Sequence, residues 1–325
     1  MKRFLLTLFV VTLLFLFLPC HAQSQPAVPS PPPIPTPPPD GQFDNVFFND
    51  ARGTTGDVDQ IEFGTPGKDK IIQYGGMGNV AQYAEGSEND DWILQVGGDL
   101  TSDQTAILGD GNDTVYQYGG KGNTTQYADA GEGNTKIIQV GGDGNNIMES
   151  QGGSGSSVAM EQYGGKGSNT MKLTGSARDD TLKMYGGIKA DNMTLNLTNG
   201  NDTVTINGGT GYDTLTISKE QKNFTVKDQN GRVLFKTGTG GSTITIAGIE
   251  YTKVIGDDGK TTLWEYRADM NQDGVLDIKD AILSMQVLAG VTPAQPAYKE
   301  GDIDGDGKIG LAEALYILQK VAGMR

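Results

Sequence analysis

The chain has 325 residues, 40 acidic against 25 basic side chains, and a net charge of −15. Cys20 and His21 are the only residues of their kinds. Their position near the start excludes disulfides, Cys/His zinc sites, cysteine nucleophiles and Ser-His-Asp triads from the rest of the chain. So acidic a surface repels nucleic acid and attracts cations, which is why we expect a calcium-rich exterior and no nucleic-acid partner.

Residues 1–22 predict a secretory signal peptide. Lys2 and Arg3 precede an apolar run that is short for a membrane span, and small residues at 20–22 resemble a cleavage site. We therefore expect a secreted protein, extracellular or at the cell surface, with no transmembrane segment. Lipid attachment at Cys20 stays open as an alternative. Residues 23–40 are rich in proline and predict an extended polyproline linker.

Residues 71–218 consist of internal repeats of nearly constant length. Tetrads related to QYGG begin, in steps of 22 or 23, at Gln73, Gln95, Gln117, Gln139, Gln162, Met184 and Ile206. Apolar residues alternate around each tetrad as they do in strands with one buried face. This pattern predicts a mainly β fold: a β-solenoid of about seven coils with two strands per coil. Residues 41–70 are expected to form its N-terminal cap, and residues 219–264 a β-rich C-terminal cap.

The tetrad glutamine is expected to point inward. Gln117 shares the face of the apolar column, and a buried amide needs hydrogen-bond partners. In a parallel stack, the glutamines of the coils above and below supply them, as in cross-β ladders. Tyr118, the next residue, is expected on the outer face.

Two families share features with these repeats. The first five repeats, with Gln, the following Gly and turn residues such as Asn79 and Asn123, resemble curlin repeats of bacterial amyloid fibres, and this resemblance implies self-association. Gly208–Leu215, which reads GGTGYDTL, resembles the RTX (hemolysin-type) calcium-binding repeat. That resemblance implies calcium at Asp213.

Acidic residues also recur at one turn position of neighbouring coils. Asp91 and Asp113 form one such pair, and Asp180 and Asp202 form another. Carboxylates stacked roughly 5 Å apart repel each other. Either a bound cation relieves this repulsion, or the side chains separate into solvent.

Residues 265–325 contain two similar loops, which begin at Asp269 and Asp302. The first has oxygen-bearing side chains at EF-hand positions 1, 3, 5, 9 and 12, and the second has them at 1, 3, 5 and 12, with Gly310 at position 9, where a water would serve. Both have Gly at position 6, and this spacing predicts Ca²⁺ binding. The expected ligands are Asp269, Asn271, Asp273, the Val275 carbonyl, Asp277 and Asp280 in the first loop, and Asp302, Asp304, Asp306, the Lys308 carbonyl and Glu313 in the second.

An amphipathic helix is expected after each loop. The apolar stripes are Ile278, Ile282, Met285 and Leu288 in one helix, and Leu311, Leu315, Leu318 and Val321 in the other. We expect these stripes to form the shared core of the module, with a partner site as the alternative. The paired loop-helix units resemble a type I dockerin, and this resemblance implies a cohesin-like protein as the partner of residues 265–325.

These features favour a secreted, calcium-binding structural, adhesive or matrix protein. The alternatives are a curlin-like functional amyloid subunit and a dockerin-bearing component of an extracellular polysaccharide-degrading assembly. No catalytic residue is identified, although carboxylate pairs for a polysaccharide lyase or glycosidase remain open in so acidic a chain. The candidate binding partners of the solenoid are its own copies, a cell surface and a polysaccharide.

Overall fold

The computed structural model describes residues 27–322, apart from 155–156, 220–222, 230, 232, 238, 250, 256–260, 266–267, 272–275, 296, 298–300, 302 and 304–307. The predicted signal peptide lies outside this part. No helix within it is long and apolar enough to span a membrane.

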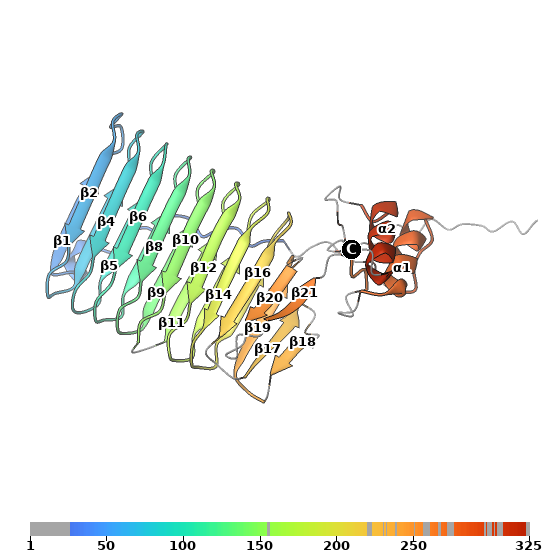
Figure 1. The fold of residues 1–325 in the computed structure, drawn as a ribbon. Helices are drawn as coiled ribbons and strands as arrows, with labels where there is room; N and C mark the ends of the chain where they lie inside the picture. Colours follow the sequence, from blue (N-terminus) through green and yellow to red (C-terminus); the bar gives the residue numbers. More distant parts are fainter. Residues whose placement is uncertain are drawn as a thin grey trace, which may run out of the picture.

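The described part of the chain is mainly β, with 21 strands in two sheets (Figure 1). Sheet A contains, in spatial order, β1 (Asn45–Asp50), β3 (Asp69–Tyr74), β5 (Trp92–Val96), β7 (Thr114–Tyr118), β9 (Thr135–Val140), β11 (Val158–Tyr163), β13 (Thr181–Tyr185), β15 (Thr203–Asn207), β19 (Ser242–Ala247), β17 (Phe224–Asp228) and β18 (Val233–Thr237). Sheet B contains β2 (Val58–Phe63), β4 (Val80–Glu85), β6 (Ser102–Ile107), β8 (Thr124–Asp129), β10 (Asn146–Gln151), β12 (Asn169–Thr174), β14 (Asn192–Leu197), β16 (Thr214–Lys219), β20 (Tyr251–Ile255) and β21 (Thr261–Glu265).

The expected β-solenoid is confirmed, but the expected number of coils is wrong. Nine turns stack in parallel, because β1 and β2 add a turn before the predicted repeats and β19 and β20 add one after them. Each turn through β16 places one strand in each sheet. The last turn departs from this pattern, since β17 and β18 are inserted before β19.

The register of the stack follows the predicted columns. Gln117 pairs with Gln95 on one side and Gln139 on the other, and it is fully buried, as expected. Sheet A carries a glutamine ladder of Gln73, Gln95, Gln117, Gln139 and Gln162, and sheet B a second one of Gln60, Gln82, Gln104 and Gln126. In both, each Nε2 after the first donates to the Oε1 one turn earlier at 2.8–2.9 Å.

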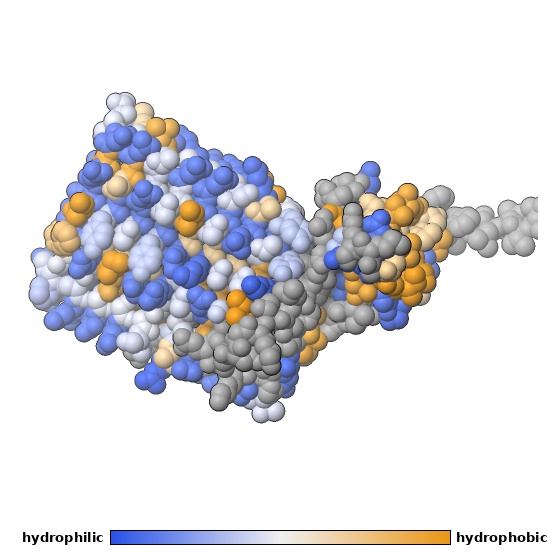
Figure 2. Space-filling view, in the orientation of Figure 1, coloured by the Kyte–Doolittle hydropathy of each residue, from blue (hydrophilic) through white to orange (hydrophobic). Residues whose placement is uncertain are grey.

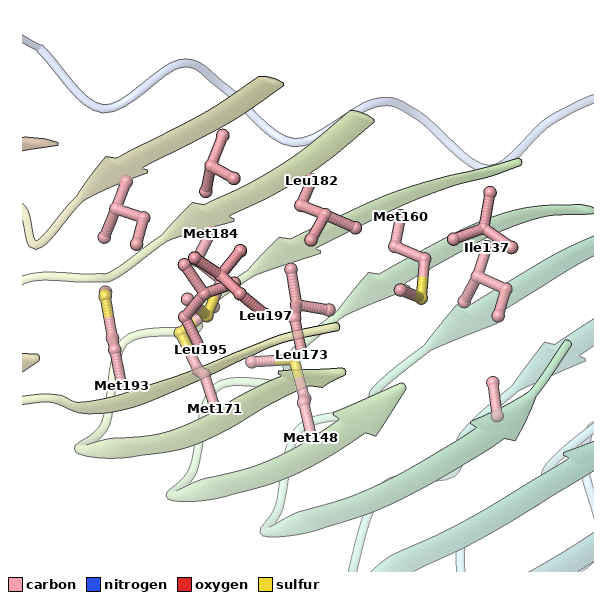
Figure 3. Packing of buried hydrophobic residues seen from close by; sticks show 14 of the residues in the cluster. Ile137, Met148, Met160, Met171, Leu173, Leu182, Met184, Met193, Leu195 and Leu197 are labelled. Atoms are coloured by element: carbon pink, nitrogen blue, oxygen red, sulfur yellow. The ribbon is translucent and has the colours of Figure 1, made fainter. Parts of the chain in front are cut away.

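Each glutamine ladder ends where methionine takes its place in the column. Met148 follows Gln126, and Met184 follows Gln162. The Oε1 atoms of these two last glutamines are buried without a hydrogen-bond partner among the described residues. Beyond this point the core is apolar and rich in methionine and leucine side chains, which point toward one another between the sheets (Figure 3).

Glycine at the corners permits close stacking of turns. A Cβ on Gly120 would lie 1.6 Å from the carbonyl oxygen of Gly98 in the previous turn. No side chain fits at that distance, which explains the glycine pair of the tetrad.

The two ends of the stack differ. At the N-terminal end, Asn49 Nδ2 donates to Glu62 Oε1 across the core at 2.6 Å. At the other end, β18 and β21 pair antiparallel with the strands beside them. The first turn therefore lacks the sheet A glutamine, and the last turn departs from purely parallel pairing.

The predicted proline-rich linker packs along sheet A. Pro33 accepts a hydrogen bond from Tyr118 Oη, and Pro38 accepts one from Lys70 Nζ. In Figure 3 a pale blue chain crosses the outer side of the strands. Tyr118 is on the outer face, as expected, but it is only 6% exposed because this segment covers it.

Two helices follow the solenoid: α1 (Ile278–Leu288) and α2 (Leu311–Val321). They contact each other and form a separate small core.

Candidate metal centre and docking face

The first acidic loop is closed by the carboxylate at its last position. Asp280 lies in the first turn of α1 and is fully buried. Its Oδ2 accepts the N–H of Asp277 at 2.9 Å, and its Oδ1 accepts the N–H of Asn271 at 3.2 Å. One carboxylate thus connects loop positions 3, 9 and 12. Asp269, at position 1, is 1% exposed.

The second loop uses its last carboxylate in the same way. Glu313 is 2% exposed, and its Oε2 accepts the N–H of Gly310 at 2.6 Å. Its Oε1 accepts the N–H of Ile303 at 3.2 Å. Ser284 Oγ of α1 also donates to the Gly310 carbonyl at 2.6 Å, which connects the first helix to the second loop.

The donor chemistry fits a hard divalent cation. A bound cation would stabilise carboxylates as buried as Asp269, Asp280 and Glu313. Calcium prefers oxygen ligands of this kind. Among the residues that the structure describes, no group of three or more acidic, Cys or His side chains is close enough to hold a metal. Of the other expected ligands, Asp273, Val275, Asp302, Asp304 and Asp306 lie outside the described residues, whereas Lys308 lies within them just before α2.

The expectation that the two apolar stripes form the core of the module is wrong. The structure leaves all eight side chains 39–56% exposed: Ile278, Ile282, Met285, Leu288, Leu311, Leu315, Leu318 and Val321. Figure 2 shows hydrophobic surface gathered over the helices. The core is instead formed by side chains of the opposite faces, among them Ala281, Leu283, Tyr316 and Ile317.

The loop carboxylates explain this rotation of the helices. Asp280 must face its loop, and each residue of an α-helix turns by about 100°. Ile278 and Ile282, two residues to either side, therefore lie on the opposite face and remain in solvent. Glu313 has the same relation to Leu311 and Leu315. The sequence already indicates this rotation, because the last ligand of each loop lies two residues from two members of the apolar stripe and therefore on the opposite face of the helix.

The stacked solenoid aspartates are brought together as expected, and the structure adds Asp69 to them. At one corner, Asp91 Oδ1 accepts the N–H of Asp69 at 2.8 Å, and Asp113 Oδ1 accepts the N–H of Asp91 at 2.7 Å. Asp180 and Asp202 continue the column with the same bond at 3.0 Å. We call this column the aspartate ladder: Asp69, Asp91, Asp113, Asp180 and Asp202.

The aspartate ladder is buried, in contrast to the alternative in which the side chains separate into solvent. Burial raises the pKa of Asp113 to about 7 and those of Asp91 and Asp202 to about 6, opposed by the backbone hydrogen bonds that the carboxylates accept. Burial also raises the pKa of Asp180. Asp113 Oδ2 is buried without a hydrogen-bond partner in the described part of the chain.

Asp213 lies at the opposite corner, away from the aspartate ladder. Its Oδ1 accepts the N–H of Asp191 at 2.8 Å, and Asp191 in turn accepts the N–H of Asn169 at 2.7 Å. Sequence reasoning missed Asp69 and Asp191. Each lies one repeat before Asp91 or Asp213, and this spacing was the signal that could have identified both.

Comparisons with protein-family models, curated proteins and solved structures give no match.

Proposed function

We propose that this chain is a secreted structural or adhesive protein, a β-solenoid rod carrying a calcium-dependent docking module. The exposed apolar face shared by α1 and α2 is the observation that carries this proposal. Soluble monomers rarely expose so many large apolar side chains together unless a partner covers them. By its resemblance to dockerins, the module would take a cohesin-like protein.

Calcium has a defined role in this proposal. Asp269, Asp280 and Glu313, with the other loop oxygens, would hold one Ca²⁺ in each loop. The bound ion supplies positive charge that allows the buried carboxylates to lie close together. Because each last carboxylate also fixes its helix, loss of the ion would disorder the docking face. The solenoid aspartates do not enter the proposal.

The test is a calcium titration of the full chain, followed by circular dichroism at 222 nm. We expect the helical signal to appear between chelator and millimolar calcium, and Glu313→Gln to shift the midpoint to higher calcium. Asp103→Asn, at an exposed position of β6, is the matched control and should leave the midpoint unchanged. A helical signal that does not depend on calcium would refute the metal role.

Docking is tested separately by capture from the protein's own secretome. Full chain should capture a partner in calcium and release it in chelator. Leu315→Asp, on the exposed face, should abolish capture while the 222 nm signal and its calcium midpoint stay unchanged. Capture that survives both Leu315→Asp and Ile282→Asp would place the partner elsewhere.

A curlin-like amyloid subunit remains the second candidate, because the glutamine ladders resemble the side-chain ladders of cross-β fibres. The ends of the rod favour the first proposal. Glu62 puts a carboxylate into the first turn, and β18 and β21 close the last one, which are devices that oppose end-to-end stacking. Fibrils of the purified full chain in electron micrographs would support the amyloid candidate, whereas isolated rods would support the structural one.

A further inference from the structure

Part of the outer face of sheet A, over β3, β5 and β7, is apolar and closed to water. Leu94 alternates with the inward residues Ile93 and Gln95, so its side chain points away from the core. It is nevertheless 0% exposed, and Ile72 in the neighbouring strand is 4% exposed. These side chains form a cluster with Trp92 and Tyr118 on the outside of the sheet.

Residues 27–39, which we call the strap, lie along this face. Tyr118 Oη donates to the Pro33 carbonyl at 2.9 Å, and Lys70 Nζ donates to the Pro38 carbonyl at 2.6 Å. Lys70 also pairs with Asp40 at 2.6 Å. The far end of the strap reaches Gly209, where a Cβ would lie 3.1 Å from Val28 Cγ2.

The length of the strap suits the stack that it crosses. A polyproline II helix rises about 3.1 Å per residue, so the ten steps from Val28 to Pro38 cover about 31 Å. The six turns between β3 and β15, at about 4.8 Å each, cover about 29 Å.

The chemistry of the contacts is that of polyproline recognition. Proline lacks an N–H, so a polyproline II helix has no internal hydrogen bonds and offers its carbonyls to outside donors. Recognition surfaces for such segments combine an aromatic face with donors to these carbonyls. Sheet A supplies both, through Trp92 and Tyr118 and through the Tyr118 hydroxyl and the Lys70 ammonium.

We propose that the outer face of sheet A is a binding site for polyproline II segments, that the strap is its resident ligand, and that the strap of a second copy can replace it. This site is separate from the docking face of the helices and does not depend on the proposed function. Exchange is sterically simple, because no backbone hydrogen bond among the described residues joins 27–38 to a strand. The strap can leave without breaking any strand pairing.

The test weakens the strap and supplies its sequence in trans. In the full chain, Pro33→Gly with Pro38→Gly keeps both carbonyls but loosens the polyproline conformation. A synthetic peptide of residues 27–40 is then titrated, with Trp92 fluorescence as the readout. We expect saturable binding to this variant and binding at least ten-fold weaker to the wild-type chain, whose own strap fills the site.

Two substitutions in the strap-weakened chain locate the site. Tyr118→Phe removes the donor to Pro33 and should weaken peptide binding about five-fold or more. Tyr127→Phe removes a hydroxyl that bonds Asp129 on sheet B, and it should leave binding unchanged. Absence of peptide binding with an unchanged β-sheet signal, or equal binding of a peptide with serine in place of proline, would overturn the proposed site.

Exchange between copies is tested with two tags. A strap-weakened chain should capture a differently tagged wild-type chain, and an excess of the 27–40 peptide should prevent this capture. Failure of capture at concentrations where the peptide binds would overturn the replacement by a second copy.

Discussion

The solenoid and the helical unit both bury carboxylates that accept backbone N–H groups, but the surroundings of these carboxylates differ. In the solenoid, Asp91 and Asp113 accept backbone N–H groups from the turn before, so the stack provides for its own polar groups. In the helical unit, Asp280 and Glu313 hold loops whose many acidic side chains repel each other at close range. A repeat can satisfy a buried acid through its neighbouring copies, whereas we propose that the small helical module takes up an ion from outside. We therefore expect the solenoid to stay folded without calcium, and the docking face to be ordered only when calcium is bound.

Removal of calcium should produce the largest difference in stability between the solenoid and the helical unit. With Ca²⁺ at a hundred times its Kd, binding adds about 2.7 kcal/mol per site to the stability of the helical unit. In chelator we expect the 222 nm helical transition to disappear from thermal unfolding curves while the β-sheet transition stays in place. A shift of both transitions together would mean that calcium also stabilises the solenoid.

Breaking the glutamine ladder should affect only the solenoid. Gln117→Leu removes the donor to Gln95 Oε1 and the acceptor of Gln139 Nε2, so we expect a loss of about 2–3 kcal/mol in urea unfolding. Gln126→Met is the matched control. It moves the unpaired carbonyl one turn earlier, to Gln104, and removes a second bond to the Val140 carbonyl, which keeps the Gly119 N–H, so it should cost about 1 kcal/mol. Equal losses would contradict the ladder as a source of stability.

The pH dependence of the solenoid should follow the aspartate ladder. The folded-state pKa of Asp113, about 7, and that of Asp91, about 6, are above the value of about 3.9 for an unfolded chain. The folded state therefore holds these protons more tightly. Their contribution is fully present below pH 4 and is lost as the pH rises through 6 and 7.

We expect the solenoid to gain at least about 1 kcal/mol in free energy of unfolding between pH 8 and pH 5. Asp113→Asn should flatten this dependence. Urea unfolding at several pH values measures it, and a solenoid that becomes less stable from pH 8 to pH 5 would contradict the prediction.

The smallest expected effect is confined to the helical unit. Ser284→Ala removes the hydrogen bond between α1 and the Gly310 carbonyl, and should lower the stability of that unit by about 1 kcal/mol in calcium. The β-sheet transition should not move. Thermal unfolding followed at 222 nm and 218 nm resolves the two.

The regular period of the repeats predicted the register of the solenoid because it determines both neighbours of every inward side chain, as Gln117 shows. The number of turns was not predictable in the same way. β1 and β2 form a turn without the tetrad, since Asn49 and Asp50 pair with Gln73 and Tyr74. At the other end, β17 and β18 come between β16 and β19 in the sequence, although β15 and β19 pair directly, and this break in the period obscures the last turn.

The position of the strap and the rotation of the helices depend on contacts between distant segments. A proline-rich stretch has no periodicity that shows which surface it contacts. The apolar outer residues Ile72 and Leu94 were the available hint, because a solvent-facing strand position is usually polar. In the helices, the amphipathic stripe alone suggested a core, and only the inward Asp280 and Glu313 show which face turns inward.

The glutamine ladders also give the rod an electrical direction. Every Nε2 points toward the N-terminal turns and every Oε1 toward the C-terminal ones. Aligned amide dipoles add and polarise one another in a medium of low dielectric constant. The positive end of this row lies at the first turns, where Glu62 places a negative charge. The negative end lies at the unpaired oxygens of Gln126 and Gln162, inside the molecule and not at its tip. The negative ends of the ladders therefore border the methionine-rich core and not the solvent at the tip of the rod.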